Sequence, residues 1–214
     1  MEVTLAVFAH LLMFAYWLGG DIGAFIASQS LTNKTLSAEQ RLTAARILNH
    51  VDMAPKTALI WSLPTGVWLG QTRGWIALDL TLLVALIGIA LVWTIVLWRL
   101  HLSHGATWLT RLDLALRIAL IAGLIATVIA AASGTLVLPG LIMAKLLILA
   151  AITALGLTVR VLVRPLGPAL MALSGGAELD DANQTIASVM FKARLCVIAI
   201  WALLISATTL GILQ

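Results

Sequence analysis

Three ionisable side chains in this sequence fall in apolar segments at a similar predicted depth. His10 lies in the first apolar run, Asp79 near the start of a later one, and Lys145 in a run rich in leucine and isoleucine. An ionisable group inside a membrane costs roughly 3 kcal/mol or more, so each is a candidate for function. Counted at about 1.5 Å per residue from the start of its helix, His10 and Lys145 lie about 9 Å deep and Asp79 about 6 Å deep. The three side chains are therefore expected to share one layer.

One chemistry that this layer could support is haem ligation. A neutral imidazole is a common axial ligand of haem iron, and a cofactor fits between the facing helices of a bundle. In one interpretation, His10 therefore binds haem iron between the helices, and Lys145 lies in the same layer. In the alternative, Lys145 and Asp79 form a buried ion pair, and His10 donates a hydrogen bond to a carbonyl group.

A second polar layer is expected at the opposite ends of the same helices. Charged residues there commonly extend towards the lipid headgroups and pair with one another, so this layer need not have a further role. Its members are Asp21, His50, Asp52, Lys56 and Arg117.

Two pairs of residues near this layer could bind a metal ion. His50 and Asp52 supply two ligand types, although a metal site with protein ligands usually needs at least a third. His101 and His104 are three residues apart, which places them on one helical face, where they could bind a metal or a haem propionate. The alternative for both pairs is solvation at the membrane surface.

The elements that must position these residues are membrane helices. Of the 214 residues, 62% are hydrophobic and 10% are charged, against roughly a quarter charged in soluble proteins. About 20 apolar residues cross a bilayer as a helix. We predict an all-α bundle in one transmembrane domain, residues 1–214, with six transmembrane helices at about 4–28, 53–72, 75–98, 113–135, 139–161 and 192–212.

The distribution of basic residues predicts the orientation of this bundle. By the positive-inside rule, basic connections are cytoplasmic, so both termini are expected on the non-cytoplasmic side. The net charge of +4 then reflects contact with anionic lipid rather than with nucleic acid. Most of the 13 lysines and arginines lie in or beside the first, third and fifth connections: Lys34, Arg41, Arg46, Lys56, Arg99, Arg111, Arg117, Arg160, Arg164, Lys192 and Arg194.

Two of the cytoplasmic connections have the pattern of short amphipathic helices on the membrane surface. Ser37 followed by Gln40 fits a capping box at the start of the first. Asp180 or Asp181 could cap the second, which carries apolar residues at helical spacing. Both are expected as separate connectors that lie on the membrane.

Two runs of the sequence resemble a superfamily of small membrane proteins that includes copper-resistance protein D and the HemJ-type protoporphyrinogen oxidases. The first run has His10, Trp17, Gly19 and Gly20 in the first apolar segment. The second is the run Pro-Gly-Leu-Ile-Met-Ala-Lys-Leu-Leu around Lys145, where those families also place a lysine.

The resemblance implies a cofactor and roles for these residues. It implies haem b with His10 as axial ligand, Lys145 as the second essential and catalytic group, and Trp17, Gly19 and Gly20 at the cofactor site. The implied activity is porphyrinogen oxidation or electron transfer. After Gly20 the HemJ-type pattern continues through aromatic residues and a proline to an arginine, whereas this chain continues with residues 21–25, Asp-Ile-Gly-Ala-Phe.

Two other functions are compatible with the sequence. One is a transporter of copper or another ion, in which the two polar layers form an inner and an outer gate. The chain lacks the Met-x-x-Met clusters that would suit copper. The other is a membrane anchor subunit without chemistry of its own. In each case we expect an integral protein of a bacterial inner membrane, with room for a redox partner in the bilayer or for a homo-oligomer.

Overall fold

The computed structural model describes residues 1–77, 79–103, 106–175 and 179–212, apart from the side chains of residues 174 and 175. Within these residues the secondary structure is helical and contains no strand, as the sequence predicts. The helices are α1 (Glu2–Thr32), α2 (Ala38–Val51), α3 (Met53–Thr72), α4 (Leu80–Leu102), α5 (Thr107–Ala132), α6 (Gly140–Leu162), α7 (Leu166–Gly175) and α8 (Leu179–Ile212).

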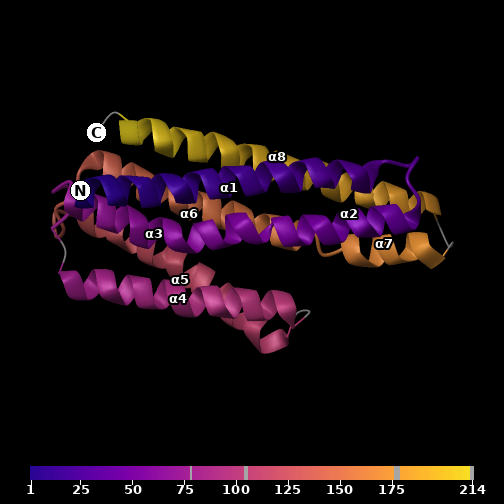
Figure 1. Ribbon diagram of the computed structural model, residues 1–214, viewed down its shortest axis with the longest axis horizontal. Coiled ribbons are helices and arrows are strands. Elements are labelled where there is room, and N and C mark those ends of the chain that lie inside the picture. The colour runs from indigo at the N-terminus through magenta and orange to yellow at the C-terminus, as the bar shows by residue number, and fades with distance from the viewer. Residues whose placement is uncertain (78, 104–105, 176–178, 213–214) are drawn as a thin grey trace.

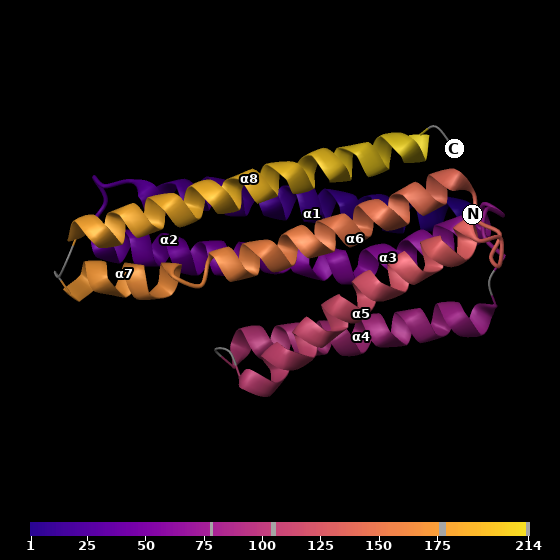
Figure 2. The same cartoon turned by 180° about the vertical axis from the view of Figure 1, so that it is seen from behind.

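The long helices run side by side and give the molecule an elongated shape (Figures 1 and 2). α1 packs along α2 and α3, and α8 lies against α6, α7 and α1. α5 lies between α4 and α6, so α4 is on the outside of the bundle. The two termini lie at one end of the molecule, and α2, α7 and the start of α8 lie at the other.

Five helical stretches are long and apolar enough to cross a membrane, which indicates an integral membrane protein. The segment predicted at 53–72 does form a helix with those bounds, α3, but it is not among the five. At 20 residues it is shorter than each of the five. The five stretches are Glu2–Thr32, Leu80–Leu102, Thr107–Ala132, Gly140–Leu173 and Leu179–Ile212.

Three predicted helix boundaries are wrong by several residues. α4 begins at Leu80 rather than at residue 75, because Trp75 and Ile76 fold back over the end of α3, where their amides donate to Gly70. α5 begins at Thr107 rather than at residue 113, so Asp113 lies inside the helix. The expected connector and the last span form one helix, α8, since no proline or glycine interrupts residues 179–210.

Two glycine turns end helices on the side of the termini. At Gly74, with φ of 72°, the amide of Trp75 donates to the carbonyl of Gly70 over 2.8 Å. At Gly134, with φ of 78°, the amide of Thr135 donates to Ala130 over 3.0 Å. Both are Schellman motifs, in which glycine adopts the left-handed conformation that side chains disfavour. The second turn confirms the predicted break between the fourth and fifth spans.

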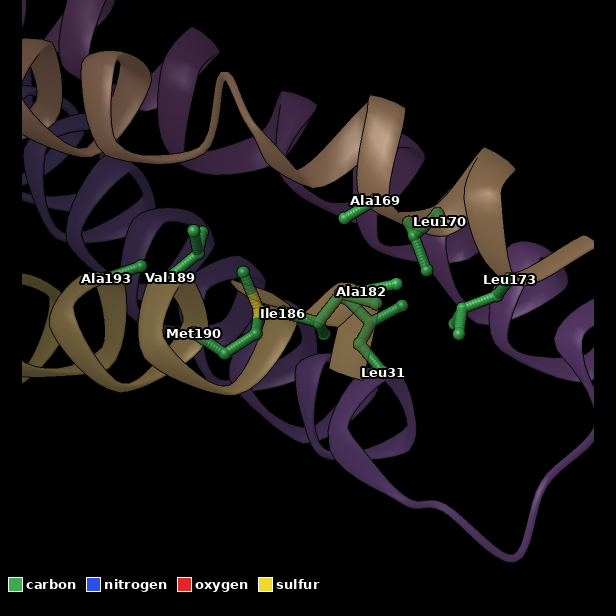
Figure 3. Close-up of a cluster of buried hydrophobic side chains, with 9 residues drawn as sticks. All are labelled: Leu31, Ala169, Leu170, Leu173, Ala182, Ile186, Val189, Met190 and Ala193. Atoms are coloured by element: carbon green, nitrogen blue, oxygen red, sulfur yellow. The ribbon is translucent and has the colours of Figure 1, made fainter. Parts of the chain in front are cut away.

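A hydrophobic cluster at the end opposite the termini joins α1, α7 and α8 (Figure 3). α2 also packs against it, through apolar residues that include Leu42, Ala45 and Leu48. The capping box of Ser37 and Gln40 at the start of α2 is confirmed. α2 and the first turns of α8 are thus part of the core rather than separate connectors. The cluster consists of Leu31, Ala169, Leu170, Leu173, Ala182, Ile186, Val189, Met190 and Ala193.

Candidate functional site

His10 lies where α1 approaches α3. An ideal Cβ on Gly66 of α3 would lie 3.2 Å from Cε1 of the His10 ring, tighter than most real contacts. The glycine therefore makes room for the imidazole between the two helices. The residue before this glycine is Thr65, and Nδ1 of His10 lies 3.1 Å from its hydroxyl oxygen.

This contact fixes the tautomer of His10. The single hydroxyl proton of Thr65 is donated to the carbonyl of Trp61, over 2.7 Å. The Thr65 oxygen can then only accept from the imidazole, so Nδ1 of His10 carries a proton and donates it. Nε2 is left with the lone pair. A histidine that ligates a metal has this arrangement, in which the other ring nitrogen donates to a neighbouring group.

Lys145, on α6, lies between the turn after α3 and the end of α8. Its Nζ lies 5.9 Å from the centre of the Trp75 ring, and Arg73 approaches the same ring at 5.7 Å. A Cβ on Gly211 of α8 would lie 3.2 Å from Nζ. The Schellman turn at Gly74 thus places Trp75 beside the lysine, within the range of cation–π attraction.

His10 and Lys145 line the same cavity, here called the terminal cavity because it lies at the end of the chain termini. Its volume is about 340 Å³, and most of its wall is apolar. A pocket of this size with a few polar groups is typical of a small-molecule or cofactor site. Its wall includes Val7, His10, Phe14, Trp17, Arg73, Trp75, Ile142, Lys145, Leu146, Ile152 and Leu204.

Asp79 does not lie in this layer, contrary to the sequence-based expectation. It is exposed and precedes α4, where its carboxylate caps the helix by accepting a hydrogen bond from the amide of Thr81 over 3.3 Å. Aspartate is a favoured N-cap because its side chain satisfies an amide that has no partner within the helix. The depth estimate for Asp79 failed because the helix starts after it.

The other residues predicted at the cofactor site occupy different places. Trp17 is buried and lines the terminal cavity. Gly20 faces α3, where an added Cβ would lie 2.6 Å from Cδ of Pro55. A Cβ on Gly19 would have no atom within 4 Å, and Gly19 is exposed. Of the three, Trp17 alone is in the wall of the cavity that holds His10 and Lys145.

A second cavity, of about 500 Å³, lies on the other side of Trp17. We call it the distal cavity. Trp17 and Ile152 line both cavities, so the two are separated by these side chains. The predicted second polar layer is largely here, because the wall includes Asp21, Asp52, Lys56 and Arg117.

A buried cluster of charges in the distal cavity was not predicted as a site. Asp113 of α5, only 2% exposed, accepts hydrogen bonds from Trp93 (2.9 Å), Arg117 (3.1 Å) and Arg160 (2.6 Å). The sequence prediction placed Asp113 at the start of a helix, where an exposed aspartate is ordinary. The signal in the sequence was the spacing of four residues between Asp113 and Arg117, which places both side chains on one face of an apolar helix.

His50 lies outside both cavities and meets His101 instead. The two rings are 4.8 Å apart and nearly perpendicular, and Nδ1 of His50 donates to the carbonyl of Arg46 over 2.9 Å. Asp52, the other predicted metal ligand, pairs with Lys56 at 2.5 Å. His104 lies outside the described residues. In the part of the chain that is described, no group of three or more His, Cys, Asp or Glu side chains could hold a metal ion.

Comparisons with family models, with curated proteins and with solved structures find no match to the chain. The resemblance to the copper-resistance and HemJ-type superfamily therefore stays a prediction from the sequence.

Proposed function

We propose that this chain is a haem-b-binding redox protein of the membrane, with haem in the terminal cavity. The observation that carries the proposal is that His10 and Lys145, far apart in sequence, line one largely apolar cavity. In that cavity the proton on Nδ1 leaves Nε2 of His10 as the atom that would bind iron. Haem would supply one-electron chemistry there.

The remaining residues have supporting roles in this proposal. Lys145 would place a cation beside the cofactor or serve as the second ligand. The apolar wall, with Trp17 as its floor, would limit the access of water. The chemistry would be electron transfer or porphyrinogen oxidation, as in the superfamily that the two sequence runs resemble, and it would need a redox partner in the membrane.

The visible spectrum of the purified protein tests the proposal. Protein expressed with ample haem should show a Soret band, which His10→Ala should abolish. His50→Ala is the matched control, since His50 is exposed and outside the cavity, and it should keep the band. A wild-type protein without a Soret band under these conditions would contradict the proposal.

The proposal includes a topology of six transmembrane helices, with α3 as the second, and both termini on the non-cytoplasmic side of a bacterial inner membrane. Two features support it. The termini lie at one end of the molecule (Figure 1), and the connections that carry most basic residues lie at the other, as the positive-inside rule requires.

Ion transport is a second candidate, favoured by the two cavities that meet at Trp17. α1 presents His10 to one cavity and Asp21 to the other, so each contains an ionisable group separated by a tryptophan and an isoleucine. Copper is one ion to test. Proteoliposomes with the wild-type protein should take up the ion, and Trp17→Ala should change the rate. No uptake and no binding of copper would exclude the copper version.

A further inference from the structure

The distal cavity is rich in arginine, and its charges do not balance locally. Asp52 and Lys56 form an ion pair. Asp113 is shared by two guanidinium groups, those of Arg117 and Arg160. One carboxylate offsets one of these two positive charges, so this cluster has an excess of one positive charge.

Arg194 of α8 adds a further positive charge. Its position in the bundle is fixed by neutral oxygens of α1: Nε donates to the hydroxyl of Ser28 over 3.1 Å, and Nη2 donates to the carbonyl of Ser28 over 2.8 Å. Nη2 also lies 3.4 Å from the hydroxyl of Thr32. These contacts orient the guanidinium without neutralising it.

Asp21 is the remaining carboxylate of the cavity, but it lies deeper than Arg194. It is seven residues before Ser28 on α1, which corresponds to about 10 Å along the helix. It also lies beside the floor formed by Trp17. The excess positive charge of the cavity therefore lies at the arginine end, away from Trp17.

We propose that the distal cavity binds the anionic headgroup of a membrane amphiphile. Its phosphate or carboxylate lies against Arg160 and Arg194, because a guanidinium matches the geometry of both anions. Basic pockets between membrane helices are established sites for anionic lipid headgroups. The apolar part of the ligand lies along the leucine and valine side chains of the same wall: Leu97, Leu100, Leu157, Val163, Leu166 and Leu170.

Lipid retention by the full-length protein tests this site without any haem signal. Nanodiscs of phosphatidylcholine with phosphatidylglycerol, followed by native mass spectrometry, should show selective retention of one phosphatidylglycerol. The double variant Arg160→Gln, Arg194→Gln should weaken retention by about 10-fold or more, as expected for lost charge-assisted hydrogen bonds. Arg164→Gln is the control, since Arg164 is exposed and outside the cavity wall.

Oleate distinguishes the two sources of the anion. Displacement of phosphatidylglycerol by oleate indicates a site for a free carboxylate as well as a phosphate, whereas retention of phosphatidylglycerol against oleate indicates a phospholipid site. Equal retention of phosphatidylcholine and phosphatidylglycerol, or an equal loss in the Arg164→Gln control, would overturn the proposal.

A thermal measurement covers the case in which the double variant is poorly folded. Arg160→Lys with Arg194→Lys keeps both charges but loses the planar fork, and phosphatidylglycerol should raise its unfolding temperature less than that of the wild-type protein. A shift as large as that of the wild-type protein would show that the arginines do not bind the headgroup.

Discussion

The hydrogen bond between His10 and Thr65 determines which nitrogen of the imidazole has a lone pair. Removing its acceptor should therefore affect any ligand bound at Nε2. We expect Thr65→Val to weaken haem retention by about 10–100-fold, the usual cost of losing a partner of a ligating histidine. Haem titration of the apoprotein measures this. Thr72→Val is the control, because the Thr72 hydroxyl donates, among the contacts described, to the carbonyl of Leu69 alone. Equal losses of haem retention in both variants would contradict the role of Thr65 as acceptor for His10.

Substitution of Lys145 distinguishes a role at the haem site from a purely structural role. We expect Lys145→Met to reduce haem retention or redox activity, and adding Asp79→Asn should not restore it, because Asp79 is an exposed helix cap. The Soret absorbance per protein measures the effect. Full recovery in the double variant would show that Lys145 acts only as the partner of Asp79, since removing both charges of a pair costs less than removing one.

For single residues, the sequence was informative where depth along a helix was enough to place the side chain. His10 and Lys145 lie well inside long apolar segments, so small errors in the helix ends did not matter. Asp79 lies at a boundary, and a shift of five residues in the start of α4 moved it out of the layer. The contact of His50 with His101 depends on how α2 and α4 are placed in space, which no local pattern specifies.

At the scale of elements, apolar runs located the helices, while turns and caps determined their ends. α3 ends at the predicted residue because the glycine turn at Gly74 follows it. α8 is longer than expected because no breaker separates its polar start from its apolar remainder.

The close approach of α1 and α3 depends on Gly20. An added Cβ would lie 2.6 Å from Cδ and 3.3 Å from the backbone nitrogen of Pro55, so the helices must move apart. We expect Gly20→Ala to destabilise the protein by about 1–3 kcal/mol, the usual cost of overpacking. Thermal unfolding in detergent measures this. Gly19→Ala should have little effect because that position is open, and equal effects would contradict the packing argument.

The cluster around Asp113 connects α4, α5 and α6. Asp113→Ala leaves two arginines without their carboxylate, and we expect a loss of about 3 kcal/mol, the lower end of the range for breaking a buried pair. The lower end applies because the Arg160 side chain is 32% exposed. Unfolding by denaturant checks the value, with the exposed Arg111→Gln as control. A loss no larger than that of the control would show that the cluster does not stabilise the bundle.

At the scale of the whole molecule, the proposed orientation can be tested with cysteine labelling. In a Cys196→Ser background, Glu2→Cys and Val137→Cys should react with a membrane-impermeant maleimide added to intact cells, because both lie at the end of the termini. Lys34→Cys should react only after the cells are opened. The opposite pattern would show that the bundle has the reverse orientation.

α8 contributes residues to the walls of both cavities. It spans 34 residues without a break, about 50 Å of helix. Arg194 fixes it to α1 beside the distal cavity, and Gly211 meets Lys145 at the terminal cavity. Because the helix is unbroken between these two contacts, a tilt of α8 at one cavity would also move its contact at the other. An anionic amphiphile bound in the distal cavity, as proposed above, would then adjust the surroundings of Lys145 in the terminal cavity.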